Sequence, residues 1–261
     1  MRYLRLLAIF YRYSIVSELE YRVELLANVF MSVFWLAWAI VSVAVFFLHS
    51  DRIGDWTWPE VLMVVALFTL FSGVMEALLR PNVGAVLDQV RDGTFDFVLT
   101  KPVNAQFIAS LRNIVVWRLS DVVIGLGLIV YALGQLHVTP TLAQDALFVL
   151  MLVAATFIVY SLWLMMVSLA FWFVKLDNFT ELFYGFYEAG RYPVTIYRGL
   201  IRGLLTFVVP IAFVTTFPAS ALLGRIDQAT VLIGIAFAVG LFVVSNRFWN
   251  FAVRHYSSAS S

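Results

Sequence analysis

The sequence of 261 residues contains no cysteine, which excludes a disulfide framework, a thiol nucleophile and a thiolate metal site. Charged residues are scarce at 13%, and hydrophobic residues make up 62%, whereas soluble domains average about 25% and about 45 to 50%. A soluble fold could not bury this much apolar surface, so the composition indicates an integral membrane protein. The formal charge of +1 gives no reason to expect a nucleic acid as a partner.

The chain also lacks the motifs of common enzymes. A nucleotide-binding P-loop needs a lysine after a glycine-rich turn, but the two lysines, Lys101 and Lys175, follow no such turn. There is no HExxH motif, and the three histidines lie far apart, at His49, His137 and His255, so no metal site is expected. We therefore expect no catalytic residue, metal or cofactor in this chain.

Six apolar stretches could cross a bilayer as helices, each of which needs about 20 residues. They predict an all-α polytopic membrane protein with one transmembrane domain over residues 1–261 and spans at about 25–48, 57–79, 118–136, 146–174, 200–224 and 229–247. Pro210 and Pro218 should kink or break the fifth span, because proline removes a backbone donor. No Asp, Glu, Lys or His lies in the middle of any of these stretches.

The distribution of basic residues predicts the orientation. With the N-terminus inside, fifteen of the seventeen Lys and Arg residues fall in cytoplasmic segments, among them a loop at 175–202, and only Arg52 and Arg225 fall outside. This is the asymmetry of the positive-inside rule, and it makes both termini cytoplasmic. Residues 1–24 interleave basic and aromatic side chains, which favours an interfacial helix before the first span. A helical extension of that span is the alternative.

The longest predicted cytoplasmic loop covers residues 76–121. Pro81 can open a helix, Val83, Val86 and Leu87 recur at helical spacing, and Asp92-Gly93 is a typical stop. The pattern predicts a short amphipathic helix that lies along the membrane. It could dock a partner, or it could be a solvated connector whose apolar face rests on the lipid headgroups.

The absence of charged residues from the middle of the predicted spans indicates what could drive transport. Proton-coupled carriers usually relay protons through ionisable residues inside the membrane, so their absence from the predicted spans argues against such a carrier. A sodium-coupled carrier that uses backbone carbonyls stays open. An intramembrane enzyme acting on lipid would need a catalytic constellation, and none is visible.

Several motifs, in their order against the six spans, resemble the small bacterial permeases of the type-2 class of ABC exporters. They are Arg91-Asp92-Gly93-Thr94-Phe95-Asp96, Lys101-Pro102-Val103, Phe171-Trp172, Tyr192-Pro193, Ile196-Tyr197, Pro210 and Phe217-Pro218. The resemblance covers nearly the whole chain. It implies a type-2 exporter fold with an N-terminal interfacial helix and a cytoplasmic coupling helix, and a segment after Pro210 that re-enters the membrane from outside.

The resemblance further implies that the coupling helix sits in a groove of a separate ATPase subunit, which binds ATP and Mg. The residues it assigns to this coupling are Val83, Val86, Leu87, Asp88, Arg91, Gly93, Asp96, Lys101 and Pro102. A second permease subunit, identical or paralogous, completes the pathway, and Gly234 with Ala238 or Ala236 with Gly240 could pack helices closely there or within one subunit.

The resemblance also implies a location in the bacterial inner membrane and export of drugs, lipids or other hydrophobic or amphipathic compounds. The aromatic content of 16% would suit a cationic amphiphile through cation–π contacts. The aromatic side chains could equally be core or lipid-facing residues, so the sequence leaves the substrate path unassigned.

Overall fold

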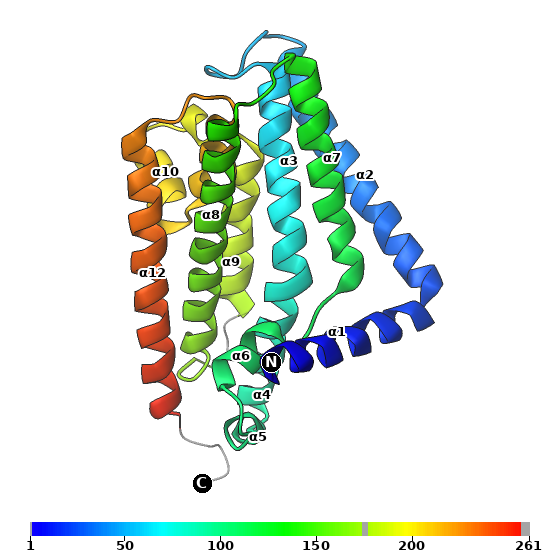
Figure 1. Cartoon of the computed structure of the whole chain (residues 1–261), viewed down its shortest axis with the longest axis vertical. Helices are drawn as coiled ribbons and strands as arrows, with labels where there is room; N and C mark the ends of the chain where they lie inside the picture. The colour runs from blue at the N-terminus through cyan, green and yellow to red at the C-terminus, as the bar shows by residue number, and fades with distance from the viewer. Residues whose placement is uncertain (1, 174–176, 257–261) are drawn as a thin grey trace.

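The computed structural model describes residues 2–173 and 177–256, and within these ranges the regular structure is helical (Figure 1). This confirms the predicted all-α polytopic class. Five helices are long and apolar enough to cross a membrane, namely α2 (Arg22–Phe47), Trp58–Arg91, Val116–Leu136, α8 (Leu142–Leu169) and α12 (Gln228–Arg254). We call the end of the bundle that carries the N-terminal helix the proximal end, and the opposite end the distal end.

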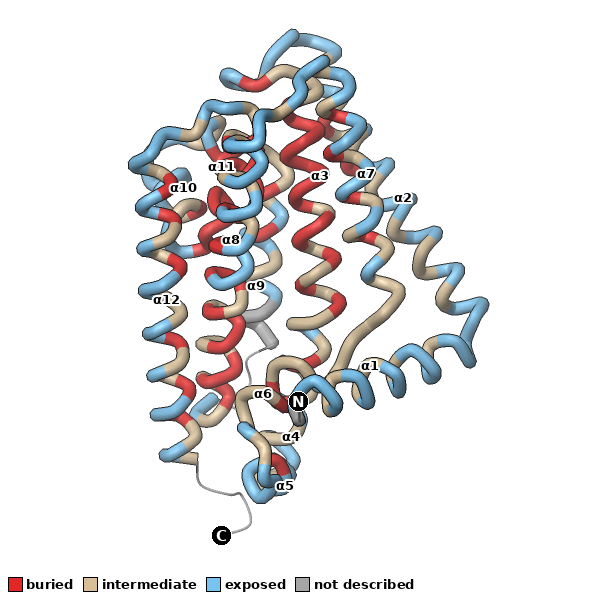
Figure 2. The backbone as a smooth tube through the Cα atoms, in the orientation of Figure 1, coloured by how far each residue is buried: buried red, intermediate tan, exposed pale blue. Residues whose placement is uncertain are grey.

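The central element is the continuous helix Trp58–Arg91, built from α3 (Trp58–Val74), the π-helical turn η1 (Met75–Leu79) and α4 (Arg80–Arg91). Neighbours cover most of α3, which is buried along its length in Figure 2. Its predicted amphipathic continuation is therefore no separate helix along the membrane but an extension of the second span. Pro81 follows directly after the π turn, in the first turn of α4, and the helix continues through it.

Two glycines allow α7 (Leu119–Leu136) to pack tightly against α3. A Cβ on Gly125 would lie 2.8 Å from the carbonyl oxygen of Ala66, and one on Gly73 would lie 2.8 Å from the Cβ of Asp121. Contacts this short would force the backbones apart, so the absence of a side chain sets the separation of the two helices.

The N-terminal helix α1 (Arg2–Glu20) crosses the proximal end of the bundle at a steep angle to α2 (Figure 1). The carboxylate of Glu18 accepts hydrogen bonds from the backbone amides of Val116 and Trp117, at 2.6 and 3.0 Å. These amides begin the 3₁₀ turn η2 (Val116–Arg118) before α7, where the positive end of a helix dipole favours an anion. Glu18 therefore ties α1 to the start of α7.

A broken segment crosses the bundle beside α3. It consists of α9 (Asp177–Tyr187) and the 3₁₀ turns η3 (Glu188–Arg191) and η4 (Val194–Ile196). The ring of Tyr187 lies 4.9 Å from that of Phe68 in the middle of α3. Further along, the Trp56 indole nitrogen at the distal end donates to the Thr195 hydroxyl at 2.8 Å. The segment thus runs from the proximal to the distal end.

A hairpin follows this crossing and both enters and leaves at the distal end. Its first arm is α10 (Gly199–Gly203) with the π turn η5 (Leu204–Val208), and its second is the π turn η6 (Ala212–Thr216) with α11 (Phe217–Leu222). The arms are bent by 74° around Pro210. Ile211 at the bend touches Gly190 of the broken crossing, whereas Arg225 after the second arm pairs with Glu60 at the distal start of α3.

The structure therefore differs from the predicted fifth span at 200–224 and from the predicted cytoplasmic loop at 175–202. The stretch at 177–196, which mixes charged and aromatic residues, runs from the proximal to the distal end, and the apolar stretch at 199–222 turns back around Pro210 to the distal end, as a re-entrant hairpin does. Arg191 then lies within the crossing, and Arg198 and Arg202 lie toward the distal end. Val174 at the end of the predicted fourth span and Lys175 are outside the described residues.

This topology predicts on which side of the membrane three arginines lie, which can be tested by labelling because the chain has no cysteine. A single cysteine at Arg202→Cys should react with a membrane-impermeant maleimide from the same side as Arg52→Cys in the distal loop. Arg112→Cys near the proximal end should react from the opposite side. If Arg202→Cys and Arg112→Cys react from the same side, the re-entrant hairpin is wrong and residues 200–224 form a plain fifth span.

Candidate functional site

The coupling residues predicted from the sequence divide into an inner and an outer set at the proximal end. Val83 and Val86 are buried, at 7% and 2% exposure, and Leu87 is partly buried against the same core. They face α6 (Ala105–Leu111) and α8, so the apolar stripe of α4 packs on the bundle. It rests neither on lipid headgroups nor on solvent, and these residues position the helix.

The turn after α4 is fixed by one glycine and one buried ring. Gly93 has a φ of +68°, a conformation that favours glycine, and the amides of Thr94 and Phe95 both donate to the Gln89 carbonyl. The Phe95 ring, fully buried, contacts Phe171, Trp249 and Tyr256, which gather around it at the proximal end. The motif at 91–96 thus encodes a tight turn anchored in the protein.

The outer set lies on the surface of this turn and of the short helix α5 (Asp96–Leu99). Asp88, Arg91, Lys101 and Pro102 are exposed, and Gly93 and Asp96 are half-buried. Burial raises the pKa of Tyr256, and the Asp96 carboxylate raises it further. The structure brings the predicted residues together as one protruding tip at the end of α4 (Figure 1).

Asn82 joins α4 to the chain that leads into α7. Its side chain, 2% exposed, donates to the carbonyls of Leu78 and Asn113 at 2.6 and 2.7 Å and accepts from the Asn113 amide at 2.8 Å. Nearby, the Val115 amide donates to the Ala77 carbonyl at 2.9 Å. These bonds hold both ends of the 80–115 segment in one place.

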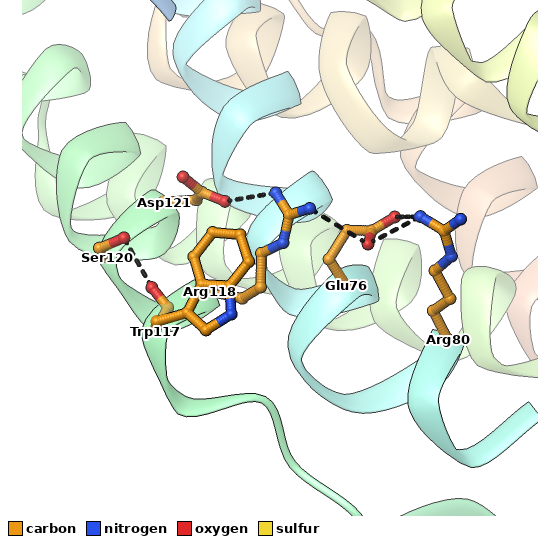
Figure 3. Close-up of polar contacts among 6 residues, drawn as sticks. All are labelled: Glu76, Arg80, Trp117, Arg118, Ser120 and Asp121. Atoms are coloured by element: carbon orange, nitrogen blue, oxygen red, sulfur yellow. Dashed lines mark hydrogen bonds and ion pairs between the residues drawn. The ribbon is translucent and has the colours of Figure 1, made fainter. Parts of the chain in front are cut away.

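A chain of four charged residues joins α3 to α7 near the proximal end (Figure 3). Glu76, in the π turn, binds Arg80 at 3.0 Å and Arg118 at 3.5 Å, and Arg118 reaches Asp121 at 3.4 Å. The Arg118 guanidinium also lies over the Trp117 ring, 4.1 Å from its centroid. A π turn is uncommon and often occurs at functional positions; here it is the turn that carries Glu76.

This cluster borders a cavity of about 650 Å³ between α2, α3, α7 and the broken crossing. At the deep end Arg191 pairs with Glu188 at 2.8 Å and lies over the Phe68 ring. Phe68 is about 15 Å along the helix from Trp58 at about 1.5 Å per residue, which is about the middle of a 30 Å hydrocarbon core. The cavity therefore extends from the proximal charge cluster to the middle of the bundle.

Arg118 and Asp121 are three residues apart in the sequence, one helical turn, but sequence reasoning did not predict the cluster or the cavity. The i, i+4 pair of Glu76 and Arg80 was a signal for local contact, although not for the contact with α7. Glu188 and Arg191 were missed because a charged stretch was taken for a loop.

These features define a polytopic α-helical membrane protein with a re-entrant hairpin, a half-polar cavity and a protruding tip at one end. A family model described as ABC-2 family transporter protein matches residues 33–260. The chain therefore belongs to the ABC-2 transporter family, as the resemblance indicated, and it is a membrane permease of an ABC transporter. The comparisons with curated proteins and with solved structures give no match.

The bonds of Asn82 predict a large stability effect from a small change. Asn82→Ala should destabilise the protein by about 2 kcal/mol, because it removes three hydrogen bonds of a buried side chain and leaves the half-buried amide of Asn113 without this partner. The measurement is the thermal unfolding midpoint of the detergent-solubilised protein. Asn250→Ala, which removes an exposed asparagine bonded only within its own helix, is the matched control. Equal midpoints for the two variants would contradict this role.

Proposed function

We propose that the chain is the permease half of an ATP-driven exporter for a hydrophobic or amphipathic substrate. ATP and Mg are bound by a separate ATPase subunit, since the permease sequence has no P-loop. The ATPase engages the tip around Asp88, Arg91, Asp96, Lys101 and Pro102. The cavity beside α3 is this half's share of the translocation path.

The continuous helix Trp58–Arg91 is the observation that carries this proposal. One end of it carries the exposed Asp88 and Arg91, and residues further up the same helix, Phe68 and Glu76, line the cavity. A helix is stiff along its axis, so a displacement of the tip by an ATPase moves the cavity wall with it. Nucleotide binding could then shift the population between two arrangements of the cavity.

The proposed assembly contains a second permease subunit, identical or paralogous, because one half has few crossings to enclose a path. Of the two small-residue pairs on α12, Gly234 and Ala238 are buried within the chain, with Gly234 against Met151 and Phe213. Ala236 and Gly240 face outward. The outward pair is therefore the one available to another helix.

The proposed location is the bacterial inner membrane, with the proximal end and both termini in the cytoplasm. The corrected topology assigns Arg52, Arg198, Arg202 and Arg225 to the distal side, and most of the remaining basic residues still fall on the proximal side. The positive-inside bias thus supports the same orientation as before. The exposed α1 would lie in the lipid headgroups.

Reversing the charges of the tip tests the proposal. Asp88→Arg combined with Arg91→Glu should reduce the amount of ATPase that co-purifies with the permease at least about tenfold, the size expected when close charge pairs across an interface become repulsive. Asp51→Arg with Arg52→Glu, an equivalent swap of exposed residues at the distal end, should leave the complex intact. An undiminished complex with the tip reversed would refute this docking site.

An ion-gradient-driven carrier is the second candidate, because the Glu188 and Arg191 pair lies within a membrane crossing. Such groups are typical of ion and proton paths. The carrier predicts substrate flux into liposomes that contain the permease and an ion gradient but no ATPase. Flux only when ATPase and ATP are supplied would rule this candidate out.

A further inference from the structure

The cavity beside α3 contains buried polar atoms that have no hydrogen-bond partner. Seven such side-chain atoms occur in the described residues, and four of them belong to residues that line this cavity: Ser32 Oγ, Tyr184 Oη, Tyr187 Oη and Arg191 Nε. The Tyr184 hydroxyl lies near Glu76 and the Tyr187 hydroxyl near Ser72, each in a weak contact that leaves the hydroxyl able to take a better acceptor. Buried groups of this kind are usually satisfied in proteins.

All four groups can donate a hydrogen bond, and Arg191 Nε can only donate. What would satisfy them together is a set of acceptor oxygens. The cavity therefore favours a ligand whose polar part is rich in such oxygens. Glu188 pairs with one end of the Arg191 guanidinium but leaves Nε unpartnered, and an anionic oxygen bonds this N–H more strongly than a neutral one.

Three aromatic rings of the cavity are already covered by arginines. Arg118 lies over Trp117, Arg80 over Tyr184 at 5.1 Å, and Arg191 over Phe68 at 5.3 Å. A cationic ligand would have to displace these guanidinium groups to reach the faces of these three rings, so cation–π recognition of a cation is disfavoured there. Stacking leaves the N–H edges of the guanidinium groups pointing at acceptors. These are the carboxylates of Glu76, Asp121 and Glu188, while Arg191 Nε remains without a partner.

Arg118 is the arginine best able to change partners. Its contacts with Glu76 and Asp121 are 3.5 and 3.4 Å, long for charge-assisted hydrogen bonds, which are typically about 2.7 to 2.9 Å. An oxyanion could therefore form shorter bonds to Arg118 without breaking a strong pair.

The wall contributed by α2 is apolar and open. Met31 and Trp35 line the cavity and are 44% and 55% exposed, so this wall is also a rim that faces outward from the bundle. In a membrane such a rim meets lipid chains, and an acyl chain can lie against it while its headgroup remains inside.

We propose that this cavity binds an amphiphile with an anionic oxyanion headgroup, a phosphate or a carboxylate, which faces Arg118 and Arg191 while its chain lies against Trp35. As a statement about the exported substrate, this rests on the proposed function. Binding itself needs no ATPase, so it is tested separately from export and from docking at the tip.

The test uses the whole purified chain in phosphatidylcholine vesicles and the fluorescence of its tryptophans. Titration with phosphatidic acid brominated on its acyl chains should give saturable quenching, and Trp35→Phe should remove much of it. Arg191→Gln should weaken binding about tenfold, as expected for the loss of a charged hydrogen bond. Arg112→Gln, an exposed arginine outside the cavity, should bind as the unmodified chain does.

Tyr187→Phe, which removes only one unpartnered hydroxyl, provides a second variant that keeps the packing and should also weaken binding. Equal quenching by brominated phosphatidylcholine, or equal binding by Arg191→Gln, Tyr187→Phe and Arg112→Gln, would overturn the headgroup assignment. If inorganic phosphate competes with the same affinity as phosphatidic acid, the acyl chain contributes nothing to binding. The cavity would then be a site for a free oxyanion, and the proposal of an amphiphilic ligand would be wrong. If the ATPase complex forms but phosphatidic acid does not bind, only this inference is refuted. If phosphatidic acid binds but no ATPase complex forms, only the proposed exporter function is refuted.

Discussion

The close packing of α3 against its neighbours is the constraint on which the rest of this structure depends. At Gly73 and Gly125 the backbones of α3 and α7 approach so closely that no Cβ fits, and the broken crossing and the second arm of the hairpin cover other parts of α3. Lipid offers helices no hydrophobic driving force for association, so close contact and polar links must hold them together. The links here are the Glu60 pair at the distal end and the Glu76 cluster at the proximal end.

This scaffold permits irregular backbone at membrane depth. Residues between Tyr187 and Gly199 and around Pro210 leave helical geometry, which is tolerated inside a bilayer only where protein covers the backbone. The buried amide of Val194 donates to the Thr216 hydroxyl at 3.0 Å, and Trp56 bonds the Thr195 hydroxyl. The hairpin and the broken crossing thus satisfy part of each other's polar groups, which explains why they pack together beside α3.

The sequence predicted the helical class, the stop at Gly93 and the location of α2, α8 and α12, because long uncharged runs with polar ends have few alternatives in a membrane. It misplaced the fifth crossing because hydropathy measures composition and not which end of the bundle a segment reaches. The stretch with Glu188 and Arg191 is polar, yet the two side chains neutralise each other and Arg191 is covered by Phe68. The apolar stretch around Pro210 is long enough to span, yet it turns back.

The coupling residues were predictable as a group from the motif. Which of them are buried and position α4, and which are exposed at the tip, was not predictable. Helical spacing shows that Val83, Val86 and Leu87 share a face, and only the tertiary structure shows that this face is buried against α6 and α8. The charge cluster was unpredictable for a related reason, since Glu76 and Arg118 are far apart in sequence and meet only because the glycines of α3 and α7 let these helices touch.

The placement of the charges has a consequence for how force could pass through the molecule. Glu76 and Arg80 belong to the same continuous helix as the tip, whereas Arg118 and Asp121 belong to α7. A displacement of that helix relative to α7 therefore changes the contact between Glu76 and Arg118. An oxyanion in the cavity competes for Arg118 and so favours the arrangement in which this contact is open. The two binding events are then coupled. If the ligand in the cavity changes the affinity of the tip for the ATPase by some factor, binding of the ATPase changes the affinity of the cavity for its ligand by the same factor.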